Sequence, residues 1–268
     1  MHIHDRIFCF LGGDSRMRWA ETQLREAGAS VAAFPCDQMT HLVLPLPAFE
    51  QNGQISQGPA LEEVLPQLRS GITILGGKLG PQGQALAGTG AAVIDYFQDE
   101  DLTAANAAVT AEGAIQLSMD RLPVTLDGTP VLVIGWGRIG QLLSCRLRAL
   151  GAQVTVSARK PRDRALIAAL GYFPEETGCY QRDLEQYRVI FNTVPAPVFS
   201  AAQAACTRRD CLLIELASSP GGISSDCPRP VLIAGGLPGK TAPETAGRLI
   251  GKTILRLASG QERSFYVE

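Results

Sequence analysis

The segment best suited to ligand binding is the glycine-rich run Gly135-Trp-Gly-Arg-Ile-Gly140. It follows an apolar run, 131–134, that predicts a buried strand, and it precedes a helical pattern of leucines that ends at Gly151. In G-x-G-x-x-G loops the first glycine allows a tight turn, the second lets main chain approach a pyrophosphate, and the third lets the helix pack on the strand. The helix start adds free N–H groups and roughly half a positive charge. The residues predicted to border the pyrophosphate of a dinucleotide are Gly135, Gly137, Arg138, Ile139 and Gly140.

The next predicted strand ends at Ser157-Ala158-Arg159-Lys160, where NAD-binding units usually carry an acid for the ribose hydroxyls. A carboxylate there would repel a 2′-phosphate, whereas Arg159 and Lys160 attract one and Ser157 can donate a hydrogen bond to it. Hydrogen bonds to charged groups contribute about 1.5–3 kcal/mol each, roughly tenfold or more in cofactor preference. These three residues therefore favour NADP over NAD, and the alternative is a solvated basic loop.

The first half of the chain repeats the plan of the second, because segments 24–31 and 147–154 align without gaps. In that register the loop residues pair as Gly12 with Gly135, Asp14 with Gly137 and Met17 with Gly140. A carboxylate and a thioether thus stand where a pyrophosphate needs bare main chain. The first half is therefore predicted to be a nucleotide-binding fold that does not bind a nucleotide.

Short apolar strands alternate with helical patterns, which predicts an α/β fold of two Rossmann-like doubly wound parallel-sheet domains with a cleft between them. We expect an N-terminal domain over residues 1–110, a bridging helix within 111–125 and the nucleotide-binding domain over 126–242. The run Thr241-Ala-Pro-Glu244 resembles a capping box and predicts the start of the last helix. That helix, within residues 243–268, is expected to pack back on the N-terminal domain.

Composition and charge disfavour several classes of function. The chain has 268 residues, of which 46% are hydrophobic, enough to bury a substantial core. A net charge of −2 and a pI near 6.0 give no electrostatic reason to bind nucleic acid or an anionic membrane. The apolar runs are too short to span a membrane. Seven cysteines without a C-x-x-C pair fit reduced cytoplasmic thiols rather than disulfides or a metal site.

Small, polar or glycine-rich residues follow three predicted strands, where doubly wound sheets bind their ligands. Together with the first glycine turn, these segments resemble the A subunit of dipicolinate synthase. The segments that carry the resemblance are Gly12-Gly-Asp-Ser-Arg16, Asn106 to Gly113, Gly135-Trp-Gly-Arg-Ile-Gly140, Ser157-Ala-Arg159, Asn192-Thr-Val-Pro195, Leu216-Ala-Ser-Ser-Pro-Gly-Gly222 and Gly236-Leu-Pro-Gly-Lys-Thr-Ala-Pro243.

The resemblance implies an NADP-dependent oxidoreductase that oxidises a dihydrodipicolinate-type ring, formed from 4-hydroxy-tetrahydrodipicolinate, to dipicolinate during sporulation. The partner that it implies is the flavoprotein-like B subunit of dipicolinate synthase. It also implies a small dicarboxylate substrate and a place in the cytoplasm of the mother cell of a spore-forming bacterium. A homo-oligomer is left open.

Such a site needs groups for the nicotinamide ribose, for two carboxylates and for a proton. We expect Asn192, Thr193 and Pro195 to lie along the ribose. The candidate carboxylate ligands are Arg16 at a helix start, with a solvated arginine as its alternative, and Ser218 and Lys240 from the nucleotide-binding domain. Glu112 at the start of the bridging helix, after a polar crossover over 98–106, is the candidate proton acceptor. Its alternative is an acid that stabilises the helix dipole.

Two other functions stay open. One is another NADP-dependent dehydrogenase, similar to the alanine dehydrogenase or 2-hydroxyacid dehydrogenase groups. Those groups usually need a histidine in the cleft, and no histidine follows His41. The other is a nucleotide-binding regulatory or scaffold subunit whose partner carries the chemistry.

Overall fold

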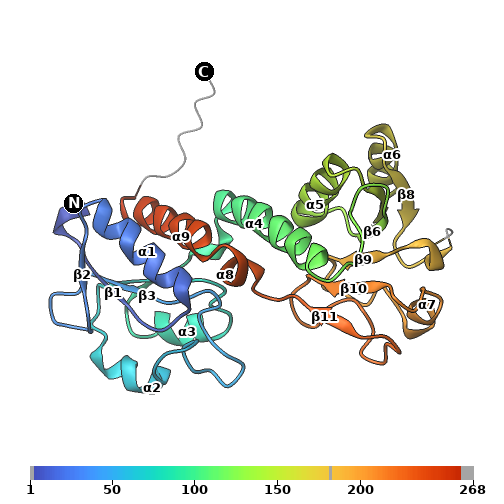
Figure 1. Ribbon diagram of the computed structural model, residues 1–268. Coiled ribbons are helices and arrows are strands. Elements are labelled where there is room, and N and C mark those ends of the chain that lie inside the picture. The colour runs from blue at the N-terminus through green and yellow to red at the C-terminus, as the bar shows by residue number, and fades with distance from the viewer. Residues whose placement is uncertain (1–2, 181–182, 261–268) are drawn as a thin grey trace. The chain divides into compact units, whose positions relative to one another are not determined.

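The structure is a computed structural model that describes residues 3–180 and 183–260 (Figure 1). The chain forms two compact units. Unit 1 holds the residues up to Asn106 and those from Pro238 onward, and unit 2 holds Ala107–Leu237. Each unit is built around one parallel sheet, so the predicted α/β class with two parallel sheets is confirmed.

The sheet of unit 1 has the strand order β2-β1-β3-β4-β5, with every neighbouring pair parallel. Its strands are β1 (Ile7–Phe10), β2 (Ser30–Ala32), β3 (His41–Val43), β4 (Thr73–Gly76) and β5 (Ala92–Asp95). One face packs against α1 (Ser15–Glu26) and α9 (Pro243–Ala258), which lie side by side in Figure 1. The other face packs against α2 (Leu61–Val64) and α3 (Gln82–Ala87). The last helix of the chain thus completes the core of the first unit.

The sheet of unit 2 has the order β11-β10-β9-β6-β7-β8, again all parallel. Its strands are β6 (Pro130–Ile134), β7 (Gln153–Ala158), β8 (Phe173–Glu176), β9 (Val189–Asn192), β10 (Leu212–Glu215) and β11 (Val231–Ile233). The helices that follow its strands are α5 (Arg138–Ala149), α6 (Pro161–Ala169) and α7 (Ala201–Ala205). Because the chain order reverses between β9 and β6, the carboxyl ends of these strands form a topological switch point, where such sheets bind ligands.

Helix α4 (Glu100–Met119) begins earlier than the sequence predicts, because the segment expected to be a polar crossover is helical. The side chain of Asp99 accepts a hydrogen bond from the Leu102 N–H at 3.0 Å and so helps to start the helix. The alanine-rich stretch that follows has high helix propensity. The boundary between the units falls inside α4, and not at residue 110.

The second boundary falls inside the short helix α8 (Leu237–Thr241), and not at residue 242. Thr241 ends α8, so it cannot cap the next helix. Ala242 is the N-cap of α9, and no side chain caps that helix. The predicted capping box is therefore wrong.

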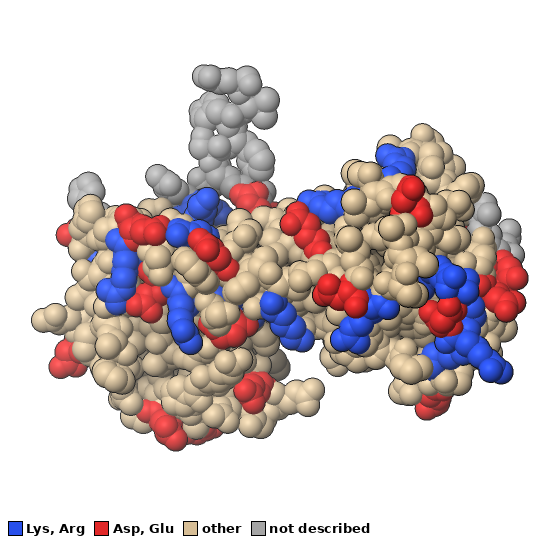
Figure 2. Space-filling view, viewed as in Figure 1, with Lys and Arg blue, Asp and Glu red and all other residues tan. Residues whose placement is uncertain are grey.

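Four 3-10 helices complete the described elements: η1 (Ile3–Asp5), η2 (Leu65–Gln67), η3 (Tyr96–Gln98) and η4 (Leu184–Gln186). None of the helices in the described part of the chain is both long and apolar enough to cross a bilayer. On the face that Figure 2 shows, positive and negative side chains are interspersed.

Candidate functional site

The glycine loop of unit 2 has the tight geometry that its spacing predicts. Gly135 follows β6 with a φ of 107°, a conformation that favours glycine. A Cβ atom on Gly140 would lie 2.1 Å from the carbonyl oxygen of Gly135. Only glycine therefore lets the first turn of α5 pack directly against the end of β6.

Gly137 leaves the start of α5 open. Its φ of −82° and ψ of −172° are ordinary extended values, and no side chain caps the helix that follows. A Cβ atom on this residue would meet no atom within 4 Å. The positive end of the helix dipole thus lies beside open space, which fits the pyrophosphate of a dinucleotide. Arg138 and Ile139 form the first turn of that helix.

Two cations stand at the end of the neighbouring strand β7. Arg159 and Lys160 are both exposed, and neither side chain contacts a charged or hydrogen-bonding group of the residues that the structure describes. Nη1 of Arg164 in α6 donates to the carbonyl oxygens of Ala158 at 3.1 Å and Arg159 at 2.7 Å. Sequence reasoning missed this third cation, which holds the loop that carries the other two. The arrangement suits a 2′-phosphate.

The structure does not support the predicted contact of Ser157 with that phosphate. Ser157 is fully buried, and its hydroxyl accepts a hydrogen bond from Oγ1 of Thr177 at 3.1 Å. The chain that leaves β8 covers this serine, so its hydroxyl lies inside the protein while Arg159 and Lys160 remain at the surface.

The residues after β9 brace the same edge of the sheet. Asn192 is fully buried, and its Nδ2 donates to the Val194 carbonyl at 2.9 Å and to Glu215 at 2.7 Å. Oγ1 of Thr193 donates to the Ile134 carbonyl at 2.8 Å, beside the glycine turn. Pro195 is exposed. Asn192 therefore shapes the strand end through its side chain, and Pro195 presents the surface on which a ribose could lie.

Glu215 is the main structural residue that sequence reasoning missed at this edge. Its buried carboxylate accepts the Asn192 amide and the N–H groups of Ala217 at 2.9 Å, Gly222 at 2.8 Å and Ile223 at 3.0 Å. A buried charge needs such donors, and together they fix the loop that contains Ser218. The signal for this role is a single acid in the apolar run 211–216.

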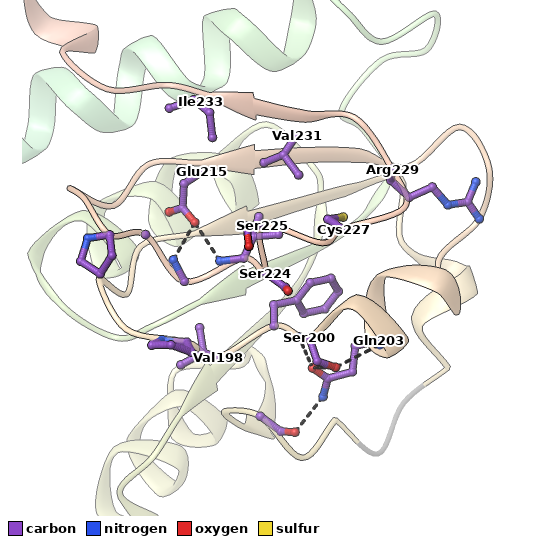
Figure 3. Close-up of a pocket in the computed structure, with 17 residues that line it drawn as sticks. Val198, Ser200, Gln203, Glu215, Ser224, Ser225, Cys227, Arg229, Val231 and Ile233 are labelled. Atoms are coloured by element: carbon purple, nitrogen blue, oxygen red, sulfur yellow. Dashed lines mark hydrogen bonds between the residues drawn. The ribbon is translucent and has the colours of Figure 1, made fainter.

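Figure 3 shows Glu215 at the wall of a cavity of about 1010 Å³. The loop after β10 and residues of β11 line this cavity, together with Ser200 and Gln203 near the start of α7. None of the residues predicted to bind the nucleotide lines it. The described residues contain no cluster of histidine, cysteine or acidic side chains that could hold a metal ion.

In unit 1, Asp14 has the backbone conformation of Gly137. Its φ of −84° and ψ of −170° differ by 2° from each of the Gly137 angles. Oδ1 of Asp14 accepts a hydrogen bond from the Arg16 N–H at 2.9 Å and so caps α1. The two loops thus share one conformation, and a carboxylate fills in unit 1 the place that is open in unit 2.

The side chain of Arg16 is fixed by hydrogen bonds to the protein and is not a solvated arginine. Its residue is 8% exposed, its Nε donates to Asp14 at 2.9 Å, and its Nη2 donates to the Leu46 carbonyl. Burial raises the pKa of the Asp14 carboxyl, but the hydrogen bonds and charge of Arg16 outweigh it and hold that pKa below its ordinary value. Nη1 of Arg16 forms no hydrogen bond with the described residues, which leaves two N–H donors for a ligand.

Lys240 belongs to unit 1, whereas the sequence analysis places it in the nucleotide-binding domain. A Cβ atom on Gly239 would lie 2.7 Å from Oδ2 of Asp14 and 2.9 Å from Nε of Arg16. Lys240 is the residue after Gly239 and is exposed. This part of α8 therefore lies beside Arg16. Ser218 is exposed in unit 2.

Glu112 does not have the environment expected of a proton acceptor. Because α4 begins at Glu100, Glu112 lies in the middle of the helix and cannot stabilise its start. Its side chain is 70% exposed and forms an ion pair with Nη2 of Arg146 at 3.5 Å. Glu112 therefore has the environment of a surface ion pair and not that of a buried general base.

His41 has a structural role. Burial and the charge of Arg6 lower the pKa of His41 to about 4. Its ring stacks on Phe8 with centroids 4.6 Å apart, and Nδ1 lies 2.8 Å from Oγ1 of Thr40. His4 and His41 are the histidines in the described part of the chain, and neither follows the carboxyl end of a strand.

Comparison with known proteins gives one sequence relative and several structural ones. No family model matches the chain. The A subunit of dipicolinate synthase from Bacillus subtilis (strain 168) is 26% identical over 278 residues, which cover 92% of this chain and 94% of that protein. The crystal structure of the corresponding A subunit from Bacillus halodurans has a TM-score of 0.85 and 25% identity, and the match covers 96% of this chain and 99% of that one.

More distant structures show the same fold. A transhydrogenase from Sinorhizobium meliloti has a TM-score of 0.71 at 13% identity, over 94% of this chain and 93% of that one. An L-alanine dehydrogenase has a TM-score of 0.63 at 13% identity, over 89% of this chain and 76% of that one. The chain therefore has the fold of two Rossmann-like parallel-sheet domains that these two structures also have, as the sequence predicts.

Proposed function

We propose that this homologue of the dipicolinate synthase A subunit is an NADP-dependent oxidoreductase that converts a dihydrodipicolinate-type ring to dipicolinate. The observation that carries the proposal is the uncapped start of α5 beside Gly137, with Arg159 and Lys160 exposed at the end of the next strand. The resemblance to a sporulation enzyme supports a role in the mother cell of a spore-forming bacterium, with 4-hydroxy-tetrahydrodipicolinate as the precursor.

When bound, NADP⁺ would supply the acceptor for a hydride from a ring carbon, and the ring would lose one proton as it becomes aromatic. The gain of aromaticity drives the reaction, so the protein mainly supplies positioning and complementary charge. In unit 2, main-chain N–H groups of α5 bind the pyrophosphate, Arg159 and Lys160 bind the 2′-phosphate, and the segment after β9 borders the nicotinamide ribose. Arg16, Lys240 and Ser218 are assigned to the substrate carboxylates.

Replacing Arg159 with Asp tests the cofactor. The Kd for NADP is expected to rise about tenfold or more, because one charge-assisted hydrogen bond is lost and a carboxylate faces the 2′-phosphate. The Kd for NAD should stay within a fewfold of its original value, since NAD has no phosphate there. Calorimetric titration of both nucleotides measures the two constants.

Arg162→Asp is the matched control, because Arg162 lies in the neighbouring α6 with a side chain 79% exposed. That variant should keep the preference of the original chain. Equal losses of NADP and NAD affinity in Arg159→Asp would contradict the phosphate assignment.

The reaction is tested by assaying the purified chain alone and with the flavoprotein-like partner, following NADPH and pyridine absorbance together. The proposal expects one NADPH for each dipicolinate formed. A nucleotide-binding regulatory or scaffold subunit would instead bind NADP without reducing it. Dipicolinate would then form only when the partner is present, and the amount of NADPH would not match the amount of dipicolinate. The positions of the described histidines give no support to the chemistry of the alanine or 2-hydroxyacid dehydrogenase groups.

A further inference from the structure

Unit 1 has a cavity at the edge of its sheet where the strands begin. Its volume is about 750 Å³, and sites for small molecules usually have roughly 300–1,000 Å³. Three of its lining residues directly precede strands, since Arg6 comes before β1, Thr40 before β3 and Ile72 before β4. These strands are parallel, so the residues before them share one edge of the sheet. Arg16 follows the carboxyl end of β1 and so belongs to the opposite edge.

The charged side chains that line this cavity are positive. They are Arg6 and Arg69, and no acidic residue of the described part of the chain lines it. Arg69 is exposed, and its side chain contacts no charged or hydrogen-bonding group of the residues that the structure describes. Arg6 has a further interaction within the protein, but a guanidinium carries five N–H donors, so one partner does not exhaust it. A hollow lined by charges of one sign concentrates ions of the other sign, which here are anions.

A buried histidine reports the positive potential at the wall of this cavity. His41 lines the cavity and is 6% exposed. Burial lowers the pKa of His41 to about 4, and the charge of Arg6 lowers it further in the same direction. The charge of Arg6 therefore acts on this wall. Because His41 is neutral near pH 7, the two arginines supply the positive charge of the described lining.

The rest of the lining suits an organic molecule that carries an anionic group. The side chains of Ser70 and Thr73 line the cavity, and neither hydroxyl forms a hydrogen bond with the described residues. A hydroxyl can donate to a phosphate or carboxylate oxygen. Met39, Ile94 and Leu257 add apolar surface. The lining therefore combines donors for an oxyanion with a surface for an apolar body.

From this arrangement we infer that the cavity binds the phosphate or carboxylate group of a small molecule with an apolar body. The guanidinium groups of Arg6 and Arg69 bind the oxyanion, because their planar forks match its oxygens. The hydroxyls of Ser70 and Thr73 donate to it, and the apolar side chains contact the body. None of the residues assigned to the nucleotide or to the substrate lines this cavity, so the site is independent of the proposed function.

The test is calorimetric titration of phenyl phosphate and of benzoate into the full chain. At least one probe is expected to bind, and the tighter probe identifies the oxyanion. Arg69→Ala should weaken its binding about tenfold, the effect of one hydrogen bond to a charged group. Arg18→Ala is the matched control, because Arg18 is an exposed arginine of α1 in the same unit and does not line the cavity. Its affinity should equal that of the original chain.

Ser70→Asp is the second variant, and it places a carboxylate among the arginines. Because Ser70 is exposed, the protein should stay folded, which thermal unfolding checks, while probe binding falls below detection. Ser70→Asn has the same size without the charge and should keep most of the affinity.

Two results would overturn the inference. One is that neither probe binds the original chain. The other is that binding stays unchanged in both Arg69→Ala and Ser70→Asp and is lost instead in Arg16→Ala or Gly137→Asp, which would place the probe in the substrate or nucleotide site. Titrations of NADP and dipicolinate test the proposed function separately, since they depend on other residues.

Discussion

Replacing Gly137 with Asp is expected to raise the Kd for NADP on the order of a hundredfold or more, because it places a carboxylate against the pyrophosphate and removes the helix N–H groups from it. The protein should stay folded. The φ of −82° at Gly137 suits any residue, and a Cβ atom there meets nothing within 4 Å. The change copies into unit 2 what Asp14 does at the start of α1. Calorimetric titration gives the Kd, and thermal unfolding checks the fold.

Gly137→Asn is the matched control, since it has the same size without the charge. It should lose less affinity than Gly137→Asp, and the difference between the two measures the repulsion. If Gly137→Asp bound NADP like the original chain, the pyrophosphate would not lie at the start of α5, and the nucleotide assignment would be wrong.

Replacing Arg16 with Ala is expected to weaken dipicolinate binding about a hundredfold while leaving the Kd for NADP unchanged. The change removes a cation oriented by Asp14, and it leaves the Asp14 carboxylate unpaired beside the incoming anion, which adds repulsion to the lost hydrogen bonds. Titration of dipicolinate into the NADP-saturated protein measures the loss.

Two further variants separate binding from folding in that experiment. Arg18→Ala changes an exposed arginine of the same helix and should have no effect on either ligand. Arg16→Lys keeps the charge without the forked contact to Asp14. Its affinity for dipicolinate should lie between those of the original chain and Arg16→Ala. A parallel loss of NADP affinity in Arg16→Ala would remove Arg16 from the substrate site.

The features that the sequence predicts well are those set by local spacing. The G-x-G-x-x-G loop is one, because the tight turn at Gly135 and the close approach at Gly140 depend on residues a few positions apart. The alternation of strands and helices is another, and it predicts the α/β class that both sheets confirm. The gapless alignment of the two halves also holds, since Asp14 and Gly137 have matching backbone angles.

The features that the sequence does not predict depend on contacts between distant residues. Ser157 is buried because the chain after β8 returns over it, which strand periodicity cannot indicate. Glu215 gathers donors from β9 and from its own loop. Lys240 lies with Arg16 because Gly239 packs closely against the start of α1. Glu112 was expected at the start of a helix but lies in the middle of α4. The reason is local, because the polar segment before it has a strong helix propensity and is itself helical.

Asp14 affects which of the two units is able to bind a nucleotide. A charge attached to the backbone is present at an effective concentration that a free metabolite does not reach. The Asp14 carboxylate is therefore always present at the positive start of α1. A nucleotide phosphate in solution competes poorly with it for that position at any coenzyme level in the cell. In the function that we propose, this one side chain at a helix start is the difference that gives the two similar units separate ligands.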